Sequence, residues 1–271
     1  MGPACMKNYF YRFAYRTQWL LAVQMGFDVR KFVLFLRGFP GYVRDYLKFR
    51  KNYKGPLNFL LCVHDRFEDG GDVNSEYFWQ DLLVARKIAD AKPQRHVDVG
   101  SRVDGFIAHV ASFRQIEVLD VRPIHKTIPG VVFKQADLMS PLSAMRNYCD
   151  SLSCLHALEH FGLGRYGDPI NPDGFDLGFK NLVDVLSPDG MFYLSFPIGE
   201  GRVEFNSHRV VDPRHLLACA EDAGLDFLEV TLIHRNASGP RIETFPPQKF
   251  DIEGILKEWY VLAVFVFKKR V

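Results

Sequence analysis

The sequence predicts a three-layer α/β protein in which helices cover both faces of a mostly parallel, seven-stranded sheet with an antiparallel last strand. Between residues 95 and 223, short apolar segments alternate with helical segments, an order that favours a parallel sheet. A glycine turn follows the first apolar segment, and an acidic residue, Asp120, ends the second. Together these observations indicate a Rossmann-like sheet, in which such a turn and such an acid meet a nucleotide-like ligand.

The individual elements follow from apolar periodicity and from turn residues. The predicted strands are 95–99, 116–120, 131–135, 151–155, 191–196, 227–233 and 260–267. Ser75 is a good cap for a helix whose apolar face holds Phe78, Leu82, Ala85 and Ile88. Further helices are predicted over 105–113, 175–186 and 213–223. A Pro-rich connection with a short helical piece joins the last two strands, which favours an antiparallel pair at the sheet edge.

The first 60 residues form a separate helical extension before a domain that spans 70–271. Residues 1–54 contain eleven Lys or Arg and only two Asp or Glu, and they are rich in aromatic residues. Glycine and proline at Gly26, Gly38–Gly41 and Gly55–Pro56 predict two or three short helices. Two interpretations stay open: peripheral contact with an anionic membrane surface through residues 1–54, or docking on the acidic remainder of the chain.

Composition excludes several classes of protein. No apolar segment approaches the roughly 18 residues that span a bilayer. The five cysteines show no paired spacing, so we expect reduced thiols, no metal site and a cytoplasmic, at most membrane-peripheral, location. The domain after the extension is acidic, which argues against nucleic-acid binding. The oligomeric state stays open.

The turn after the first predicted strand carries the cofactor prediction. Gly100 and Gly105 would let the backbone approach a ligand, but Arg102 replaces the central glycine of a NAD-type fingerprint. Asp98, two residues before the turn, would repel a pyrophosphate and attract the ammonium group of S-adenosylmethionine. The alternative is that Asp98 caps the turn. Asp120 is placed to bind ribose hydroxyls, or is an ordinary acid at a strand end.

Polar residues also follow the third, fourth and fifth predicted strands, at the sheet edge where open α/β folds bind ligands. Asp137 could accept from an adenine amino group or be a solvated loop residue. His156, Glu159 and His160 are candidates for proton transfer, with His160 as the general base and Glu159 orienting it. The alternative is that the two histidines only staple the loop.

Two polar loops supply candidates for binding an acceptor. Arg165 and Tyr166 lie in a glycine-rich loop, and His208 and Arg209 follow the fifth strand. The two arginines could hold a phosphate or carboxylate of the acceptor. Pairing with Asp168 or Asp212 is an equally good interpretation.

The segment "CDSLSCLHALEHFGLGRYGDP" (149–169) is similar to the motif that follows the fourth strand in class I S-adenosylmethionine-dependent methyltransferases. With "HVDVGSRVDGF" and "FNSHRVVDP" it resembles a domain-of-unknown-function branch of that superfamily, over roughly residues 70–270. The resemblance implies S-adenosylmethionine as cofactor: Asp98, Gly100 and Ser101 would meet its methionine part. Asp120 would meet the ribose and Asp137 the adenine. Arg102 departs from the glycine common in these enzymes.

The predicted function is therefore methyl transfer from S-adenosylmethionine to a small or glycan-like acceptor, with proton removal assisted by His160 and Glu159. Two alternatives remain: a non-catalytic binding protein on a degenerate methyltransferase fold, and a NAD-linked dehydrogenase or epimerase that uses Gly100, Gly105 and Asp120.

Overall fold

The structure is a computed structural model that describes residues 14, 16–67, 73–236 and 239–271. The chain divides into two compact units, one up to residue 72 and one from residue 73 onward. Within the described residues, no helix is long and apolar enough to cross a membrane. Four cysteines in these ranges are free (Cys62, Cys149, Cys154 and Cys219), and Cys5 lies outside them.

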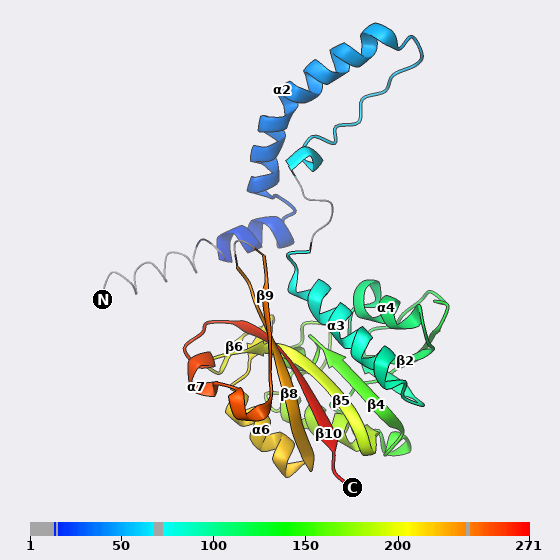
Figure 1. The fold of residues 1–271 in the computed structure, drawn as a ribbon, viewed down its shortest axis with the longest axis vertical. Coiled ribbons are helices and arrows are strands. Elements are labelled where there is room, and N and C mark those ends of the chain that lie inside the picture. Colours follow the sequence, from blue (N-terminus) through cyan, green and yellow to red (C-terminus); the bar gives the residue numbers. More distant parts are fainter. Residues whose placement is uncertain (1–13, 15, 68–72, 237–238) are drawn as a thin grey trace, which may run out of the picture. The chain divides into compact units, whose positions relative to one another are not determined.

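A single long helix, α2 (Val29–Asn52), dominates the first unit and follows the short π-type turn η1 (Leu20–Gln24) (Figure 1). The Asp28 carboxylate caps α2, accepting from the backbone N–H groups of Arg30 and Lys31 at 2.8 and 3.3 Å. The predicted break at Gly38–Gly41 is wrong, because the helix continues through Pro40. Gly38 is buried where a Cβ would lie 2.6 Å from the Val63 carbonyl oxygen, so its glycine serves close packing rather than a turn.

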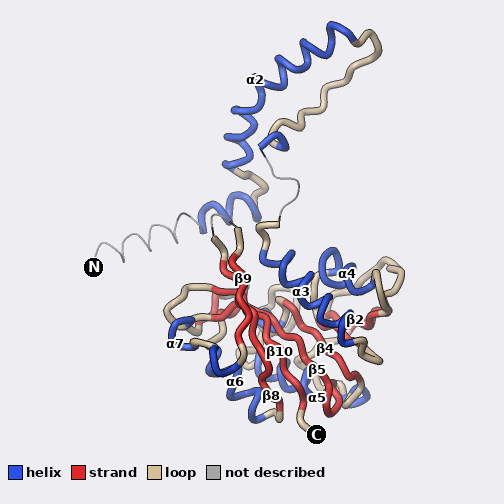
Figure 2. Tube along the Cα trace, in the orientation of Figure 1, coloured by secondary structure: helices blue, strands red, loops and turns tan. Residues whose placement is uncertain are grey.

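After α2 the chain returns along the helix as an extended segment that ends in η2 (Asp65–Phe67) (Figure 2). The Tyr46 and Phe59 rings pack at 4.9 Å between centroids, with their planes tilted by 33°, and Arg66 pairs with Asp45. One face of α2 is therefore covered by its own unit.

The second unit is built on an eight-stranded sheet in the order β3-β2-β1-β4-β5-β10-β8-β9. The five parallel strands are β1 (His96–Val99), β2 (Ile116–Asp120), β3 (Val131–Gln135), β4 (Cys149–Leu155) and β5 (Leu186–Ile198). The last strand, β10 (Val261–Lys269), is antiparallel to both β5 and β8 (Leu225–His234). The predicted parallel sheet with an antiparallel last strand is confirmed.

Two details of the sheet differ from the prediction. An additional strand, β9 (Arg241–Phe245), pairs antiparallel with β8 and raises the strand number from seven to eight. The β8–β10 pair is antiparallel as expected, but β10 lies inside the sheet and β9 forms the edge. Residues 261–267 of β10 form a continuous apolar run that is buried on both faces, which is why an interior position suits it.

Helices cover both faces of this sheet (Figures 1 and 2). On one face, α3 (Glu76–Ala91), η3 (Val103–Ile107) and α4 (Ala108–Ala111) pack against a core that includes Leu262, Val264 and Val266 of β10. On the other, α5 (Gly174–Val185), α6 (Pro213–Asp222) and α7 (Ile252–Ile255) pack against a core that includes Phe265 and Phe267. Successive residues of β10 thus enter opposite cores, as strand geometry requires.

The helix predictions hold for α5 and α6, but two others change. The helix predicted over 105–113 is the π-type turn η3 followed by the single turn of α4. In α3, Leu82 is 42% exposed, and the buried face instead holds Glu76, Gln80 and Asp81 beside Val84, Ala85 and Ile88. This face carries polar side chains because its first turns lie near the carboxyl ends of the strands. There Glu76 contacts His156 and Gln80 contacts Ser195.

The remaining elements are short. Strands β6 (Arg202–Glu204) and β7 (His208–Val210) form a separate two-stranded hairpin. Single 3₁₀ turns are η4 (Ser143–Met145), η5 (Leu158–His160) and η6 (Pro247–Lys249).

Candidate cofactor pocket and buried histidine cluster

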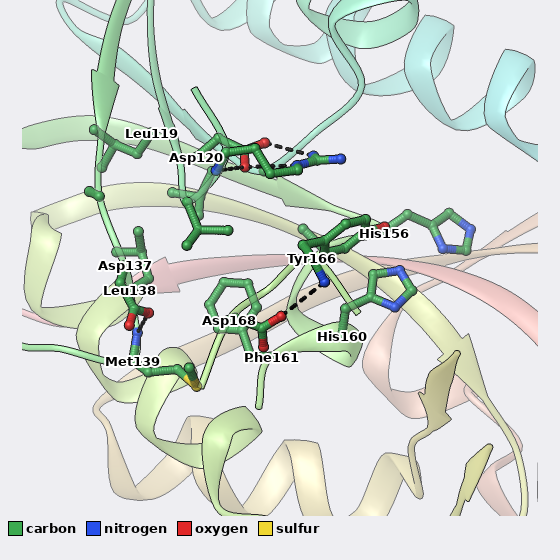
Figure 3. A pocket seen from close by; sticks show the side chains of 16 residues that line it. Leu119, Asp120, Asp137, Leu138, Met139, His156, His160, Phe161, Tyr166 and Asp168 are labelled. Carbon is green, nitrogen blue, oxygen red and sulfur yellow. Dashed lines mark hydrogen bonds and ion pairs between the residues drawn. The ribbon is translucent and has the colours of Figure 1, made fainter. Parts of the chain in front are cut away.

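A pocket that is open to solvent lies at the carboxyl ends of β1 to β4 (Figure 3). This is the place where open α/β sheets bind ligands. Of the predicted site residues, it brings together six around one space: Gly100, Asp120, Asp137, His156, His160 and Tyr166. Apolar side chains complete the wall, namely Val99, Leu119, Val121, Ala136, Leu138, Met139, Ala157 and Phe161.

Gly100 forms the floor of the turn after β1. Its φ of +70° lies in the left-handed region, and a Cβ there would sit 2.8 Å from the Cβ of Ala157. Both the backbone conformation and the space therefore require glycine. Gly100 lies on the pocket wall, and the close approach of a ligand to its backbone stays a prediction.

Asp98 is fully buried and does not line the pocket. Its carboxylate accepts from the Ser101 backbone N–H (3.1 Å), the Ser101 hydroxyl (2.6 Å) and the Ser153 hydroxyl (2.5 Å). Ser101 Oγ in turn accepts from the Leu155 backbone N–H at 3.1 Å. Asp98 and Ser101 thus tie the turn to β4, as the turn-capping alternative for Asp98 expects. Direct contact of either residue with a cofactor stays a prediction.

Burial raises the pKa of Asp98 to about 7, although the hydrogen bonds from Ser101 and Ser153 oppose the shift. The folded pKa is then above the unfolded value of about 3.9, so the folded state binds the proton more tightly. Stability from this group is fully present below the unfolded pKa and is lost as the pH rises toward 7. We expect Asp98→Asn, which cannot ionise, to remove this part of the pH dependence of the unfolding free energy.

The measurement is urea unfolding of both proteins between pH 4 and 8. The asparagine would lower the unfolding free energy by an amount that does not depend on pH, because its NH₂ group and the Ser101 N–H are both donors. The difference between wild type and variant should therefore change with pH in favour of the variant. A constant difference across the range would contradict the raised pKa.

Asp120, at the end of β2, lies on the pocket as predicted, but its oxygens already bind Arg122. The Arg122 guanidinium donates to both carboxylate oxygens at 3.0 and 2.7 Å, and its backbone N–H donates at 2.8 Å. The same guanidinium lies 4.3 Å from the centre of the Tyr166 ring. Arg122 was not predicted as a site residue, because nothing in the sequence distinguishes it from a solvated loop arginine.

Asp137 is also on the pocket wall, with one oxygen accepting from the Met139 backbone N–H at 2.9 Å. Within the part of the chain that the structure describes, its second oxygen makes no hydrogen bond or ion pair. The expected contact with adenine stays a prediction.

Arg102 and Gly105 lie outside the pocket wall. The Arg102 side chain is 51% exposed, pairs with Asp104 at 2.8 Å and lies over the Tyr77 ring at 5.0 Å. The departure from glycine at this position therefore does not fill the pocket. At Gly105 a Cβ would collide with the Asp81 carboxylate, so this glycine lets α3 approach the turn.

His156, Glu159 and His160 form one buried cluster after β4. Glu159 is fully buried, and its Oε1 lies 2.7 Å from His156 Nδ1 and 3.6 Å from His160 Nε2. The segment is a 3₁₀ turn rather than an α-helix, with His156 at φ +52°. The two histidines meet through the shared carboxylate and not through a helical i, i+4 face.

A second buried carboxylate, Glu76 of α3, joins this cluster and was not anticipated. Its Oε1 lies 3.6 Å from His156 Nε2 and accepts from the Tyr260 hydroxyl at 2.7 Å, while Arg235 binds both oxygens. Burial alone would raise the pKa of Glu76, but His156 and Arg235 lower it to about 2. Burial would likewise lower the pKa of His156, but Glu159 and Glu76 raise it to about 9. His156 is therefore a buried cation between two carboxylates.

His160 has the opposite character. Burial lowers its pKa, so the imidazole is neutral near pH 7. Its Nδ1 lies 2.5 Å from the Ser207 carbonyl oxygen, which can only accept, so Nδ1 carries the hydrogen. Nε2 is then the basic nitrogen, and it lies beside Glu159. Of the predicted catalytic residues, His160 has the protonation state of a general base, and it lines the pocket.

The predicted acceptor-binding residues divide into two groups. Tyr166 lines the pocket and meets the His160 ring edge-on at 5.6 Å, and Arg165 donates to the Ser207 carbonyl at 3.0 Å. Arg209 is almost fully buried and donates to the carbonyls of Glu159, Phe161 and Pro172. His208 is also outside the pocket wall.

Neither arginine makes the alternative pairs that the sequence left open. Asp212 pairs with Arg214, and Asp168 accepts from the backbone N–H groups of Gly162, Gly164 and Tyr166. Asp168 lies on the pocket wall and fixes the glycine-rich loop that carries Tyr166 (Figure 3).

Although no metal site was expected, one group of described residues brings ligand atoms together. On α5 and α6, the distances from His215 Nε2 are 2.8 Å to Asp176 Oδ1 and 3.7 Å to Cys219 Sγ. Two of the three residues are exposed and none lines the pocket. The sequence shows only the His215–Cys219 spacing, because Asp176 comes from another helix.

The sheet order, with an antiparallel strand inserted beside β5, and the pocket at the carboxyl ends of β1 to β4 define the fold of class I S-adenosylmethionine-dependent methyltransferases. The chain is similar in fold to a 1,6-didemethyltoxoflavin-N1-methyltransferase from Burkholderia thailandensis, solved with bound 1,6-didemethyltoxoflavin and S-adenosylhomocysteine. Identity is 14% and the TM-score 0.52, over 80% of this chain and 95% of that one.

Other comparisons are weaker. The [4+2]-cyclase SpnF gives a TM-score of 0.49 at 16% identity, over 70% of this chain and 82% of that chain. A family model described as "Caenorhabditis protein of unknown function, DUF268" matches residues 125–230. No curated protein matches the sequence.

Proposed function

We propose that this chain is an S-adenosylmethionine-dependent methyltransferase that acts on a small or glycan-like acceptor. The observation that carries the proposal is the joint position of Gly100, Asp120, Asp137 and His160 around one pocket. A glycine turn, two strand-end carboxylates and a neutral histidine are the groups that binding a nucleoside and deprotonating an acceptor require. Membership of the branch marked by "LHALEHFGLGRYGDP", and a cytoplasmic location, remain part of this proposal.

In the proposed complex, Gly100 lets the cofactor approach the backbone and Asp120 binds its ribose hydroxyls. Arg122 orients the Asp120 carboxylate through its hydrogen bonds to both oxygens. Asp137 accepts from the adenine amino group. Asp98 and Ser101 fix the turn through their buried hydrogen bonds, so we assign them positioning roles. We keep their contact with the methionine part of the cofactor as part of the proposal.

S-adenosylmethionine supplies an activated methyl group on sulfur, whose bonding electrons stay on sulfur when the methyl group leaves. His160 Nε2 accepts the proton that an acceptor hydroxyl or amine gives up as it forms the new bond. Glu159, 3.6 Å from Nε2, stabilises the imidazolium that results. Arg165 and Tyr166, beside His160, would position the acceptor, and His208 would support the same wall.

Calorimetric titration with S-adenosylmethionine, S-adenosylhomocysteine and NAD tests the proposal. We expect the first two to bind and NAD not to bind. Asp120→Ala should weaken S-adenosylmethionine by about 10- to 100-fold, the value of hydrogen bonds to a charged group. Asp90→Ala, an exposed acid of α3, is the matched control and should leave the affinity unchanged.

Binding of NAD alone would replace the proposal with a dehydrogenase or epimerase. Binding of none of the three would favour the non-catalytic alternative. Equal affinities for wild type and Asp120→Ala would remove Asp120 from the ribose site.

A further inference from the structure

Helix α2 carries an apolar stripe that the described residues of its own unit leave uncovered. Six side chains, each between 39% and 57% exposed, make up this stripe: Val29, Phe32, Val33, Leu36, Val43 and Leu47. At 100° per residue they fall within an arc of about 100°, and they extend over about 27 Å of helix. An apolar arc of this width is what an amphipathic helix buries against a partner.

The packing of the first unit identifies the stripe as the free face. Gly38, opposite the stripe, lies against Val63 of the returning segment, and Tyr46, on the flank of the helix, lies against Phe59. The returning segment therefore packs on faces of α2 other than the stripe.

The charges of α2 indicate what covers the stripe. The helix holds seven basic residues and one acid, Asp45, which is already paired with Arg66. Four of the basic residues lie together along one border of the stripe, on the same helical wheel: Arg30, Arg37, Arg44 and Lys48. An apolar arc bordered by basic side chains matches a lipid surface, whose acyl boundary takes the apolar side chains and whose anionic headgroups take the cations.

We propose that the α2 stripe binds the surface of an anionic membrane, with α2 lying in the plane of that surface. A second copy of this chain fits less well as the partner. Pairing two α2 helices would bring the seven basic residues of one helix close to the seven of the other, and these like charges repel. The proposal concerns residues 29–52 and is independent of the reaction in the second unit.

Co-sedimentation of the full-length chain with vesicles tests the proposal. We expect binding to mixed phosphatidylserine and phosphatidylcholine vesicles, and much weaker binding to phosphatidylcholine alone. The variant Leu36→Asp/Val43→Asp should lower the affinity by at least about 100-fold, because two apolar side chains no longer enter the membrane. Leu82→Asp/Val203→Asp, with the same charge change on exposed apolar residues of the second unit, should bind like wild type.

A second variant keeps the test valid if the aspartates disturb folding. Arg30→Gln/Lys48→Gln leaves the stripe intact and should weaken binding to the mixed vesicles about 25-fold, since each basic residue near an anionic surface contributes about fivefold. Wild-type protein that does not sediment with the mixed vesicles would overturn the proposal. So would stripe variants that bind vesicles normally, including any that convert a dimer to a monomer.

Discussion

Replacing His160 with glutamine should lower the rate of methyl transfer by about 10²- to 10⁴-fold, the contribution of a positioned general base. Glutamine keeps a polar side chain of similar reach but cannot accept the proton at neutral pH. Because the proposed complex places His160 beside the acceptor and not beside the ribose or adenine, the affinity for S-adenosylmethionine should change little. Methyl-transfer assays and titration with S-adenosylmethionine measure the two quantities separately.

The pH profile supplies a second readout. Because burial lowers the pKa of His160, the wild-type rate should rise with pH below the ordinary histidine value of about 6.5 and level off at neutral pH. The variant should lack this rise. His234→Gln, a histidine of β8 outside the pocket wall, is the matched control. Equal rates for wild type and His160→Gln would mean that the acceptor loses its proton elsewhere.

Replacing His156 with asparagine should lower the free energy of unfolding by about 3–5 kcal/mol, the cost of removing one partner from a buried ion pair. Glu159 and Glu76 are both buried, and His156 is the cation between them. Asparagine tolerates the left-handed backbone found at this position, so the loss reports charge rather than strain. Urea unfolding at pH 7 measures it.

The pH dependence has a definite sign. The folded pKa of His156, about 9, exceeds the unfolded value of about 6.5. Its stabilisation is therefore fully present below about pH 6.5 and is lost as the pH rises toward 9. The variant should lack this loss.

His156→Asn/Glu159→Gln is the matched double variant, and it should recover part of the stability because one buried charge is then neutral. A single variant as stable as wild type would show that the two carboxylates do not depend on His156.

Much of the fold could be predicted from the sequence because local patterns encode it. Apolar segments of strand length, separated by helical segments, require a parallel sheet with two helical layers. The errors occur where local signals mislead: Gly38 and Pro40 resemble a turn, yet Gly38 serves close packing with Val63. The edge strand β9 has too few apolar residues to be recognised without its partner β8.

The candidate site divides in the same way. Gly100, Asp120 and Asp137 could be identified because each follows a predicted strand, and the carboxyl ends of parallel strands meet at one edge. The sequence left turn capping by Asp98 open as an alternative, but neither its hydrogen bond from Ser153 nor the role of Arg209 could be predicted, because Ser153 and the Glu159 carbonyl lie far along the chain from them.

The α/β architecture, the glycine turn, the strand-end acids and the basic, aromatic character of the first residues all follow from local sequence patterns. Folding, in contrast, decided which acids face the pocket and which are buried behind it. It also decided that Glu76 of α3 joins His156 and Glu159, more than 70 residues later in the chain. The physical reason is that a residue's type fixes its chemistry locally, whereas burial and charge partners, which set its pKa, come from segments that only folding brings together.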